Sequence, residues 1–521
     1  MRLWDNKMID ITKVPENDDK VWDMIGDGRV KGCFQIESHL GKTWCKKLKP
    51  ENMTELAALI SIIRPGTLKA IVDGKSMTQH FVDRKHGKET IPSLHPLIDD
   101  LLTETYGVIV YQEQAMEIAV KLAGFNLKEA DNLRKAIGKK KADLMKKIRK
   151  QFIKGCTNNN VEKEKAEEIF DMIEKSARYS FNKSHAVAYA KMAYWSAWTK
   201  YHYPEKFFKH WLRNADEKID PDFEKKQLIT SAKSENIKIH GPNINYLEEN
   251  FFWKNKSIYF GICNVKNVGN IHLKQLQEKI EDLKKDKVTW SNLLVHVLPF
   301  VNKRAIENLI KVGAFGGFKK SRTEMLHEFH CYLDLTKKEI EQVQKNIECS
   351  QINSLQVLEK LVSNGVKKDG GMISTQKRLE KVKAIVTRMQ NPGRSLVDNA
   401  MVYAKMEEKL LGCAINHSEL NACSDACHAN STCKEITDGK MDDSIVAVVI
   451  KRLREHKTKN GDTMVFLSVE DDSGELENIV VFPDIYEQNK DIMYEEATVL
   501  LSGRVRDKQR NSFIVDKIFL I

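Results

Sequence analysis

The side chains best suited to chemistry in this 521-residue sequence are cationic, and many lie in one segment. Residues 121–155 contain 12 Lys or Arg and three Asp or Glu, a charge of +9, compared with +11 for the whole chain. Ammonium and guanidinium groups concentrated on helices bind polyanions through charge and hydrogen bonds. We therefore predict that this segment contacts phosphate. The alternative is a solvated lysine-rich helix face, the commoner role of such runs.

A second group with suitable chemistry is the polar loop 182–185 within SFNKSHAVAYA. Its Asn, Lys, Ser and His side chains offer several donors where a helix is predicted to begin, and helix N-termini bind phosphate. We predict nucleotide or template contact, with N-capping as the alternative. Gln112, Glu113 and Gln114 open another predicted helix, and their sequence is equally compatible with capping and with substrate contact.

Composition limits the class of protein. With 41% hydrophobic and 30% charged residues the chain is typical of globular proteins, and a pI near 8.9 favours an acidic partner such as nucleic acid. No apolar run reaches the ~18–20 residues of a membrane span. The N-terminus also lacks an apolar signal region. We predict a cytoplasmic protein without membrane contact.

Ten cysteines are present, and most are isolated within apolar segments, as expected for reduced thiols. Cys423, Cys427, His428 and Cys433 have the residue types of a zinc site, but their spacing is not a familiar ligand pattern. We expect a loop with free thiols, and metal binding remains the alternative.

The elements that must position these groups follow from periodicity. Apolar residues recur with a spacing near 3.6 over 127–213, which predicts helices. From residue 441 the pattern changes to five alternating strands, with a short helical piece between the third and fourth. This is typical of an OB-fold barrel. For Phe466 and Phe482, core packing is expected and base stacking is the alternative. The fold class is a multidomain protein, mostly α-helical and ending in an all-β barrel.

Several motifs, in this order, resemble the C-terminal half of the alpha subunit of bacterial replicative DNA polymerase III, a family C polymerase. They are GCFQIES (32–38), LISIIRPGTL (59–68), FVDRKHGKE (81–89), ADNLRKAIGKKK (130–141), FNKSHAVAYA (181–190), IYFGICNVKNVG (258–269) and EEKLLGCAINHSEL (407–420). The resemblance implies a fingers domain at 1–217, a helix-hairpin-helix DNA-binding region at 218–330, a helical connector resembling a clamp-binding region at 331–440, and an OB-fold at 441–521.

The family synthesises DNA with two Mg²⁺ ions held by palm carboxylates. No counterpart of the palm aspartates is found, and Asp220 and Asp222 lie in a polar, proline-containing stretch that we predict to be a linker. We therefore expect one part of a split polymerase that binds dNTP and primer-template DNA. A separately encoded palm chain would hold the Mg²⁺, and this chain would be inactive alone. The alternative is a non-catalytic DNA-binding accessory protein. QINSL at 351–355 is a poor clamp motif, so the sliding clamp remains an open partner.

The resemblance also assigns site residues. Predicted nucleotide- or phosphate-binding residues are Arg64, Arg84, Lys85, His86, Gln112, Gln114, Arg134, Lys135, Lys139, Lys140, Asn182, Lys183, Ser184 and His185. Predicted DNA-binding residues are Lys141, Lys266, Gly269, Lys457, Lys459, Arg504, Arg506, Lys508 and Arg510. Gly138 should interrupt its helix. Asn267 stands where the family's hairpin has Gly, and Asn tolerates the left-handed conformation that such a turn needs.

Overall fold

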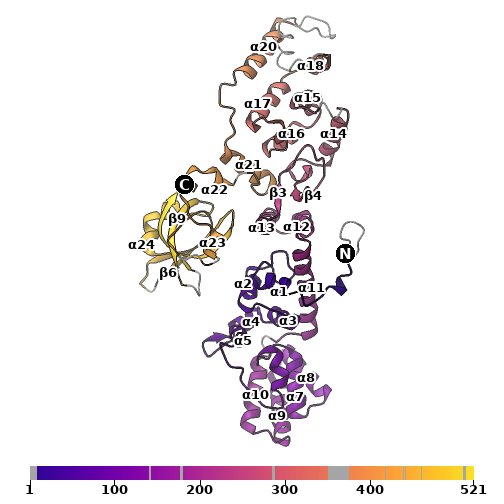
Figure 1. The fold of residues 1–521 in the computed structure, drawn as a ribbon. Helices are drawn as coiled ribbons and strands as arrows, with labels where there is room; N and C mark the ends of the chain where they lie inside the picture. Colours follow the sequence, from indigo (N-terminus) through magenta and orange to yellow (C-terminus); the bar gives the residue numbers. More distant parts are fainter. Residues whose placement is uncertain are drawn as a thin grey trace. The chain divides into compact units, whose positions relative to one another are not determined.

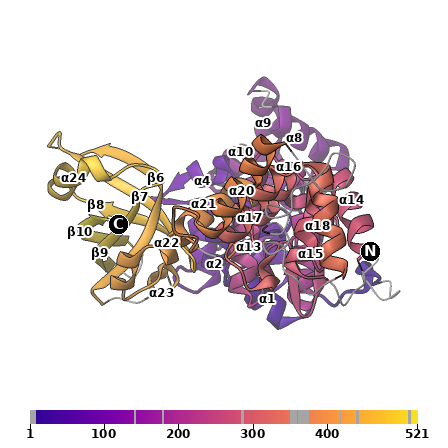
Figure 2. The same ribbon diagram turned by 90° about the horizontal axis from the view of Figure 1, so that it is seen from above.

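The chain divides into two compact units, residues 1–207 and 208–521, which the computed structural model shows in Figures 1 and 2. The structure describes residues 9–139, 142–176, 180–283, 288–349, 359, 375–416, 418–437, 439, 442–458, 460–507 and 512–521. The predicted end of the fingers domain, residue 217, falls within the second unit. No helix among the described residues combines the length and the apolar character that crossing a membrane requires.

The first unit is helical and has two hydrophobic cores. Its helices are α1 (Asp19–Gly26), α2 (His39–Leu48), α3 (Met53–Ile62), α4 (Pro65–Lys69), α5 (Met77–Lys85), α6 (Asp99–Leu102), α7 (Gln112–Ala123), α8 (Leu127–Lys139), α9 (Ala142–Asn158), α10 (Lys163–Ser176) and α11 (Lys183–His202). One core lies among α1, α2, α3 and α11, and the other lies among α7, α8, α9 and α10. A two-stranded hairpin, β1 (Ile71–Val72) and β2 (Lys75–Ser76), joins α4 to α5.

The basic segment forms two amphipathic helices. α8 buries Leu133 and Ala136, and α9 buries Ile148 and Phe152, in the second core of the unit. Gly138 is the penultimate residue of α8, which ends at Lys139, and the next helix begins at Ala142, so the interruption predicted at Gly138 stays a prediction.

The stretch predicted to be a linker, around Asp220 and Asp222, lies within the second unit and forms the start of a helix. Helix α12 (Pro204–Arg213) leads into it, and α13 (Pro221–Ser234) starts with proline at its first position, where the missing N–H costs nothing. Asp220 caps α13 by accepting a hydrogen bond from the Phe223 N–H. The linker prediction for this stretch is therefore wrong.

A small sheet and a set of helices make up the first part of this unit. The sheet has the order β3-β5-β4, from β3 (Lys238–His240), β4 (Phe252–Lys254) and β5 (Ser257–Tyr259). The helices are α14 (Asn270–Glu281), α15 (Trp290–His296), α16 (Lys303–Lys311), α17 (Arg322–Leu333), α18 (Lys337–Cys349), α20 (Gln376–Gln390), α21 (Ala400–Leu411), α22 (Glu419–Ala422) and α23 (Cys433–Thr437).

The last part is a closed five-stranded barrel with the strand order β10-β8-β7-β6-β9. Its strands are β6 (Ser444–Lys457), β7 (Thr463–Asp471), β8 (Gly474–Val481), β9 (Thr498–Asp507) and β10 (Ser512–Leu520). Helix α24 (Pro483–Asn489) lies between β8 and β9 in the chain and beside the barrel strands (Figure 2). Its Tyr486 side chain belongs to the barrel core. Strands β8 and β10 pair in parallel, and the other pairs are antiparallel. This confirms the predicted OB-fold.

A buried ion pair fixes the turn that follows α21. Arg322 lies 2.8 Å from Glu407, whose side chain is fully buried. Glu407 also accepts hydrogen bonds from the backbone of Ile415 and from the backbone and amide of Asn416. Because every acceptor position is used, the charge is compensated inside the protein.

Replacing Glu407 with Gln should destabilise the second unit by about 3–5 kcal/mol, because Arg322 would remain buried without its carboxylate. Urea unfolding at neutral pH measures this loss. Glu408→Gln is the matched control, since Glu408 is partly exposed and its ion pair with Lys226 is long, at 3.5 Å. Equal stability of the two variants would contradict the stabilising role given to the buried Arg322–Glu407 ion pair.

Candidate nucleotide and nucleic-acid interface

Arg64 is a half-buried cation at the turn between α3 and α4. Its guanidinium lies over the Phe181 ring, 3.8 Å from the centroid. Burial lowers the pKa of Arg64, but arginine remains charged at neutral pH. Among the described residues no carboxylate pairs with it. The Phe181 ring therefore supports the guanidinium without neutralising it, and Arg64 can accept an anionic ligand.

A row of aromatic rings continues from this arginine. The His185 ring lies 5.3 Å from that of Phe181 and 4.0 Å from that of Tyr189, and Tyr189 contacts Phe34 at 5.2 Å. Phe34 and His185 are exposed. Exposed rings beside a cation suit nucleotides, whose bases stack while their phosphates bind the charge. Sequence reasoning did not find Phe34, although it lies in the quoted GCFQIES motif.

The polar loop 182–185 caps α11. The side-chain oxygen of Asn182 accepts hydrogen bonds from the His185 N–H and the Ser184 hydroxyl. Glu113, on α7, accepts from the Asn182 amide at 2.8 Å and from the Lys183 N–H at 3.0 Å. Donors at the start of α11 are thus already used, and a carboxylate sits at its positive end. The structure confirms the capping alternative for Asn182, and it favours Arg64 over this N-terminus as a phosphate site.

Gln114 is an internal link between segments. Its oxygen accepts from the N–H groups of Val110 and Tyr111, and its amide donates to Leu101 and Thr105. The side chain is buried with all these partners satisfied. The structure thus shows the capping alternative for Gln114, and this buried geometry does not favour the predicted substrate contact. Gln112 begins α7, and its N–H donates to the Phe181 carbonyl at 2.9 Å, which joins the starts of α7 and α11.

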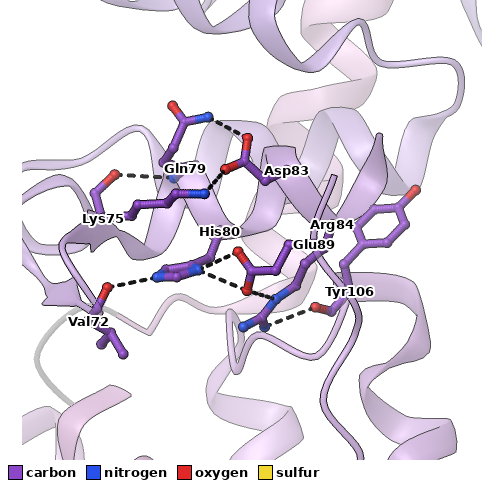
Figure 3. Close-up of polar contacts among 9 residues, drawn as sticks. Val72, Lys75, Gln79, His80, Asp83, Arg84, Glu89 and Tyr106 are labelled. Atoms are coloured by element: carbon purple, nitrogen blue, oxygen red, sulfur yellow. Dashed lines mark hydrogen bonds and ion pairs between the residues drawn. The ribbon is translucent and has the colours of Figure 1, made fainter. Parts of the chain in front are cut away.

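Arg84 belongs to a polar network between α5 and the β1–β2 hairpin (Figure 3). It pairs with Glu89 at 2.8 Å, and the same carboxylate contacts the buried His80 at 2.7 Å. The other ring nitrogen of His80 lies 2.8 Å from the Val72 carbonyl oxygen. Burial opposes ionisation of Glu89, but hydrogen bonds from His80 and Arg84 outweigh it and lower its pKa. Arg84 therefore stabilises the fold around the hairpin.

Lys85 and His86 are also engaged within the protein. Lys85 is almost fully buried and lies 2.8 Å from Glu55, and His86 contacts the Lys47 carbonyl at 2.8 Å. Glu55 further accepts from the Tyr106 hydroxyl at 2.7 Å. The motif DRKHG thus supplies internal contacts, and phosphate binding by its cations remains a prediction that this geometry does not favour.

The cations of α8 and α11 are more accessible. Arg134 and Lys135 both pair with Asp131 along one exposed helix face, at 2.8 and 2.6 Å. Such exposed pairs are worth at most about 1 kcal/mol, so phosphate can replace the carboxylate. Lys183 pairs with Glu104 at 2.5 Å. Lys139 ends α8, its side chain is not described, and Lys140 and Lys141 lie outside the described residues.

The predicted hairpin of the second unit is present, at 265–269. Asn267 has φ of +67°, which confirms that asparagine adopts the left-handed turn here. Gly269 caps α14, and a Cβ placed on it would have no neighbour within 4 Å, so its backbone is open to a ligand. Lys266 lies on the same turn and pairs with Asp222 at 2.7 Å.

The outer face of the barrel combines aromatic and cationic side chains. Arg454 on β6 lies opposite Phe466 on β7, which lies opposite Val480 on β8. Phe466 is 37% exposed and Phe482 is 44% exposed, so the expectation of core packing is wrong for both. Sequence reasoning missed Arg454, although alternation along β6 places it on the outer face.

The other predicted barrel cations are only partly described. Lys457 and Arg504 are exposed on β6 and β9. Arg506 lies in β9 with its side chain undescribed, and Lys459, Lys508 and Arg510 lie outside the described residues. Their contact with DNA remains a prediction.

The zinc alternative for Cys423, Cys427, His428 and Cys433 finds no ligand set in the part of the chain that the structure describes. No group of three or more His, Cys, Asp or Glu side chains there is arranged to hold an ion. Cys433 is buried, and its N–H donates to Asp471, whereas Cys427 is exposed. The residues described here do not fit a magnesium site, so no metal-dependent step is assigned to them.

Comparison with known proteins shows which proteins this chain is similar to. The finger domain of the bacterial DNA polymerase III alpha subunit matches residues 2–160, and a helix-hairpin-helix motif matches residues 236–325. The DNA polymerase III subunit alpha of Aquifex aeolicus is 32% identical over 98% of this chain. Those of Staphylococcus aureus strain MSSA476 and Staphylococcus epidermidis are 29% and 28% identical over 98% and 99% of it.

The chain is a relative of the bacterial DNA polymerase III alpha subunits. It spans 40–44% of the length of these three relatives. The finger match contains Arg64, Arg84 and the α8 cations, and the hairpin match contains Lys266 and Gly269. The alpha-subunit resemblance predicted from the motifs is confirmed over nearly the whole chain.

Glu55→Gln should lower the stability of the first unit by about 3 kcal/mol at pH 7, because the buried Lys85 ammonium would lose its close, buried carboxylate and keep the exposed Glu51 carboxylate at 3.6 Å. Burial opposes ionisation of Glu55, yet hydrogen bonds from Lys85 and Tyr106 outweigh it and lower its pKa. Its contribution is therefore present above the ordinary Glu pKa of about 4.3 and is lost as pH falls through the lowered value.

Urea unfolding at pH 7 and at pH 3 checks this expectation. The stability difference between wild type and Glu55→Gln should shrink at pH 3, and Glu51→Gln serves as control because Glu51 is exposed and 3.6 Å from Lys85. A difference that does not change with pH would contradict the role given to the carboxylate.

Proposed function

We propose that this chain is the part of a replicative DNA polymerase that binds primer-template DNA and the phosphates of the incoming nucleotide. The observation that carries the proposal is Arg64, a charged group without a carboxylate partner among the described residues, beside an exposed row of rings. Further support comes from relatives that are named DNA polymerase III subunit alpha.

Phosphoryl transfer needs positioning and neutralisation of charge, and it needs little covalent chemistry from the protein. In this proposal Arg64 presents its forked donors to a phosphate, and the rings of Phe34 and His185 stack on bases. On α8, phosphates of the DNA backbone replace the Asp131 carboxylate as the partner of Arg134 and Lys135. The barrel face around Phe466 holds single-stranded template.

The catalytic metals belong to a different part of the proposed enzyme. A palm carried by a separately encoded chain would hold the Mg²⁺ ions that drive bond formation. The second candidate is a DNA-binding accessory protein, which the hairpin and the barrel alone would support. The two candidates differ in whether the fingers complete an active site.

Primer extension separates these candidates. This chain should not incorporate nucleotides alone, and it should support Mg²⁺-dependent extension when mixed with a palm-containing chain that is inactive by itself. Incorporation by the isolated chain would contradict the split arrangement. Failure with a correctly folded palm partner would favour the accessory protein.

Phe466→Ala should weaken binding of single-stranded DNA by at least about fivefold, because a stacked base contributes about 1–3 kcal/mol, which corresponds to about 5- to 150-fold in affinity. Phe519→Ala is the matched control, since Phe519 is also exposed, at 53%, but lies on β10 opposite Leu500. Fluorescence anisotropy measures both variants at several salt concentrations. Affinity should fall with salt for every variant, since phosphate contacts release counterions. Equal losses of affinity for the two variants would show that the barrel face around Phe466 is not the binding site for single-stranded DNA.

A further inference from the structure

The hairpin lysine is held by an acidic side chain of the same unit. The Lys266 ammonium lies 2.7 Å from the Asp222 carboxylate, which stands in the first turn of α13. The two side chains are 50% and 45% exposed, so DNA can reach the pair.

The backbone of Lys266 is fixed from two sides. Its N–H donates to the Leu410 carbonyl at 2.9 Å, and its carbonyl accepts from the Asn308 amide at 2.8 Å. The hairpin therefore cannot shift to carry Lys266 away from Asp222 while these bonds persist. Rotation of the side chains is the movement that separates the charges.

Gly412 provides the space in which Asp222 sits. This residue ends α21 with φ of +84°, and a Cβ placed on it would lie 2.6 Å from an Asp222 oxygen. Any larger residue at position 412 would push the carboxylate away. The position of Asp222 beside the hairpin is thus built into the fold.

The groove beside the hairpin carries more acidic than basic groups. Its volume is about 560 Å³, and its charged lining residues are Asp216, Asp220, Asp222, Lys225 and Lys266. Lys225 pairs with Asp216 at 2.6 Å, and Lys266 pairs with Asp222. Asp220 is left as the third carboxylate on this surface, where its oxygen caps α13. A duplex backbone approaching the hairpin would meet this negative charge.

We propose that Asp222 is an internal competitor of the DNA backbone for Lys266. A lysine ammonium is a compact point charge, and a carboxylate at 2.7 Å occupies the position that a phosphate oxygen needs. Binding of duplex DNA at the hairpin must displace Asp222 and also overcome its repulsion. Asp222 thereby lowers the affinity of the hairpin for duplex DNA. The inference rests on the proposed DNA-binding function.

The test compares variants of the full chain on a fluorescent primer-template duplex. Asp222→Asn keeps the size of the side chain and its fit against Gly412, but it releases Lys266. It should bind about two- to fivefold tighter than the control Asp282→Asn, the range expected for freeing an exposed ion pair. Asp282 is exposed, pairs with Lys279, and changes the net charge equally.

Salt dependence supplies a second readout. One new phosphate contact should steepen the slope of log affinity against log salt by about 0.9 for Asp222→Asn. In a Lys266→Ala background the substitution should give no gain beyond that of Asp282→Asn. Thermal melting verifies that each variant is folded.

The possible outcomes distinguish a failure of this inference from a failure of the proposed DNA-binding function. Wild-type protein that binds no DNA would overturn the proposed function itself. Wild-type binding together with equal affinities for Asp222→Asn and Asp282→Asn would overturn only the competition. A gain that persists without Lys266 would also overturn it, because the effect would then not act through that lysine.

Discussion

The cost of burying an unpaired charge is the constraint on which this structure depends. Removing one partner of a buried ion pair costs about 3–5 kcal/mol, so a buried cation needs an acceptor inside the protein, which is a carboxylate or, as for Lys200, a backbone carbonyl group. Lys85 with Glu55 and Arg322 with Glu407 follow this rule. Arg64 departs from it, since it rests on an aromatic ring and no carboxylate pairs with it in the described part of the chain. A departure of this kind marks a place where an anion is expected from outside.

The rest of the first unit positions that arginine. The starts of α7 and α11 are joined by Glu113, and the Phe181 backbone bonds to both Val110 and Gln112. Phe181 is therefore held by backbone hydrogen bonds beneath the guanidinium. Charge pairing is also found in the second unit, where Asp222 forms an ion pair with the accessible Lys266. The pairing there is exposed, so it modulates binding and contributes little to stability.

Much of the fold followed from the sequence because its signals are local. Apolar spacing on α8 and α9 and alternation on β6 specify a helix pair and a barrel strand without knowledge of partners. Prediction failed at Pro221, where the position at the start of a helix outweighed the usual preference of proline for loops. The roles of the site residues were harder to predict for another reason. Which carboxylate pairs with a given cation depends on the tertiary structure, and local sequence does not reveal it.

Glu113 and Asn182 illustrate this limit, since they bond to each other from 69 residues apart. Residue types alone could not separate cations that hold the fold, such as Arg84, from a cation without a carboxylate partner among the described residues, such as Arg64. Comparing Arg64→Ala with Arg84→Ala tests that separation directly, by measuring DNA affinity and thermal stability for each. Arg64→Ala should bind primer-template more weakly and melt near the wild-type temperature, whereas Arg84→Ala should melt lower because Glu89 loses the guanidinium and keeps the contact with His80. Unchanged affinity in Arg64→Ala would contradict the account.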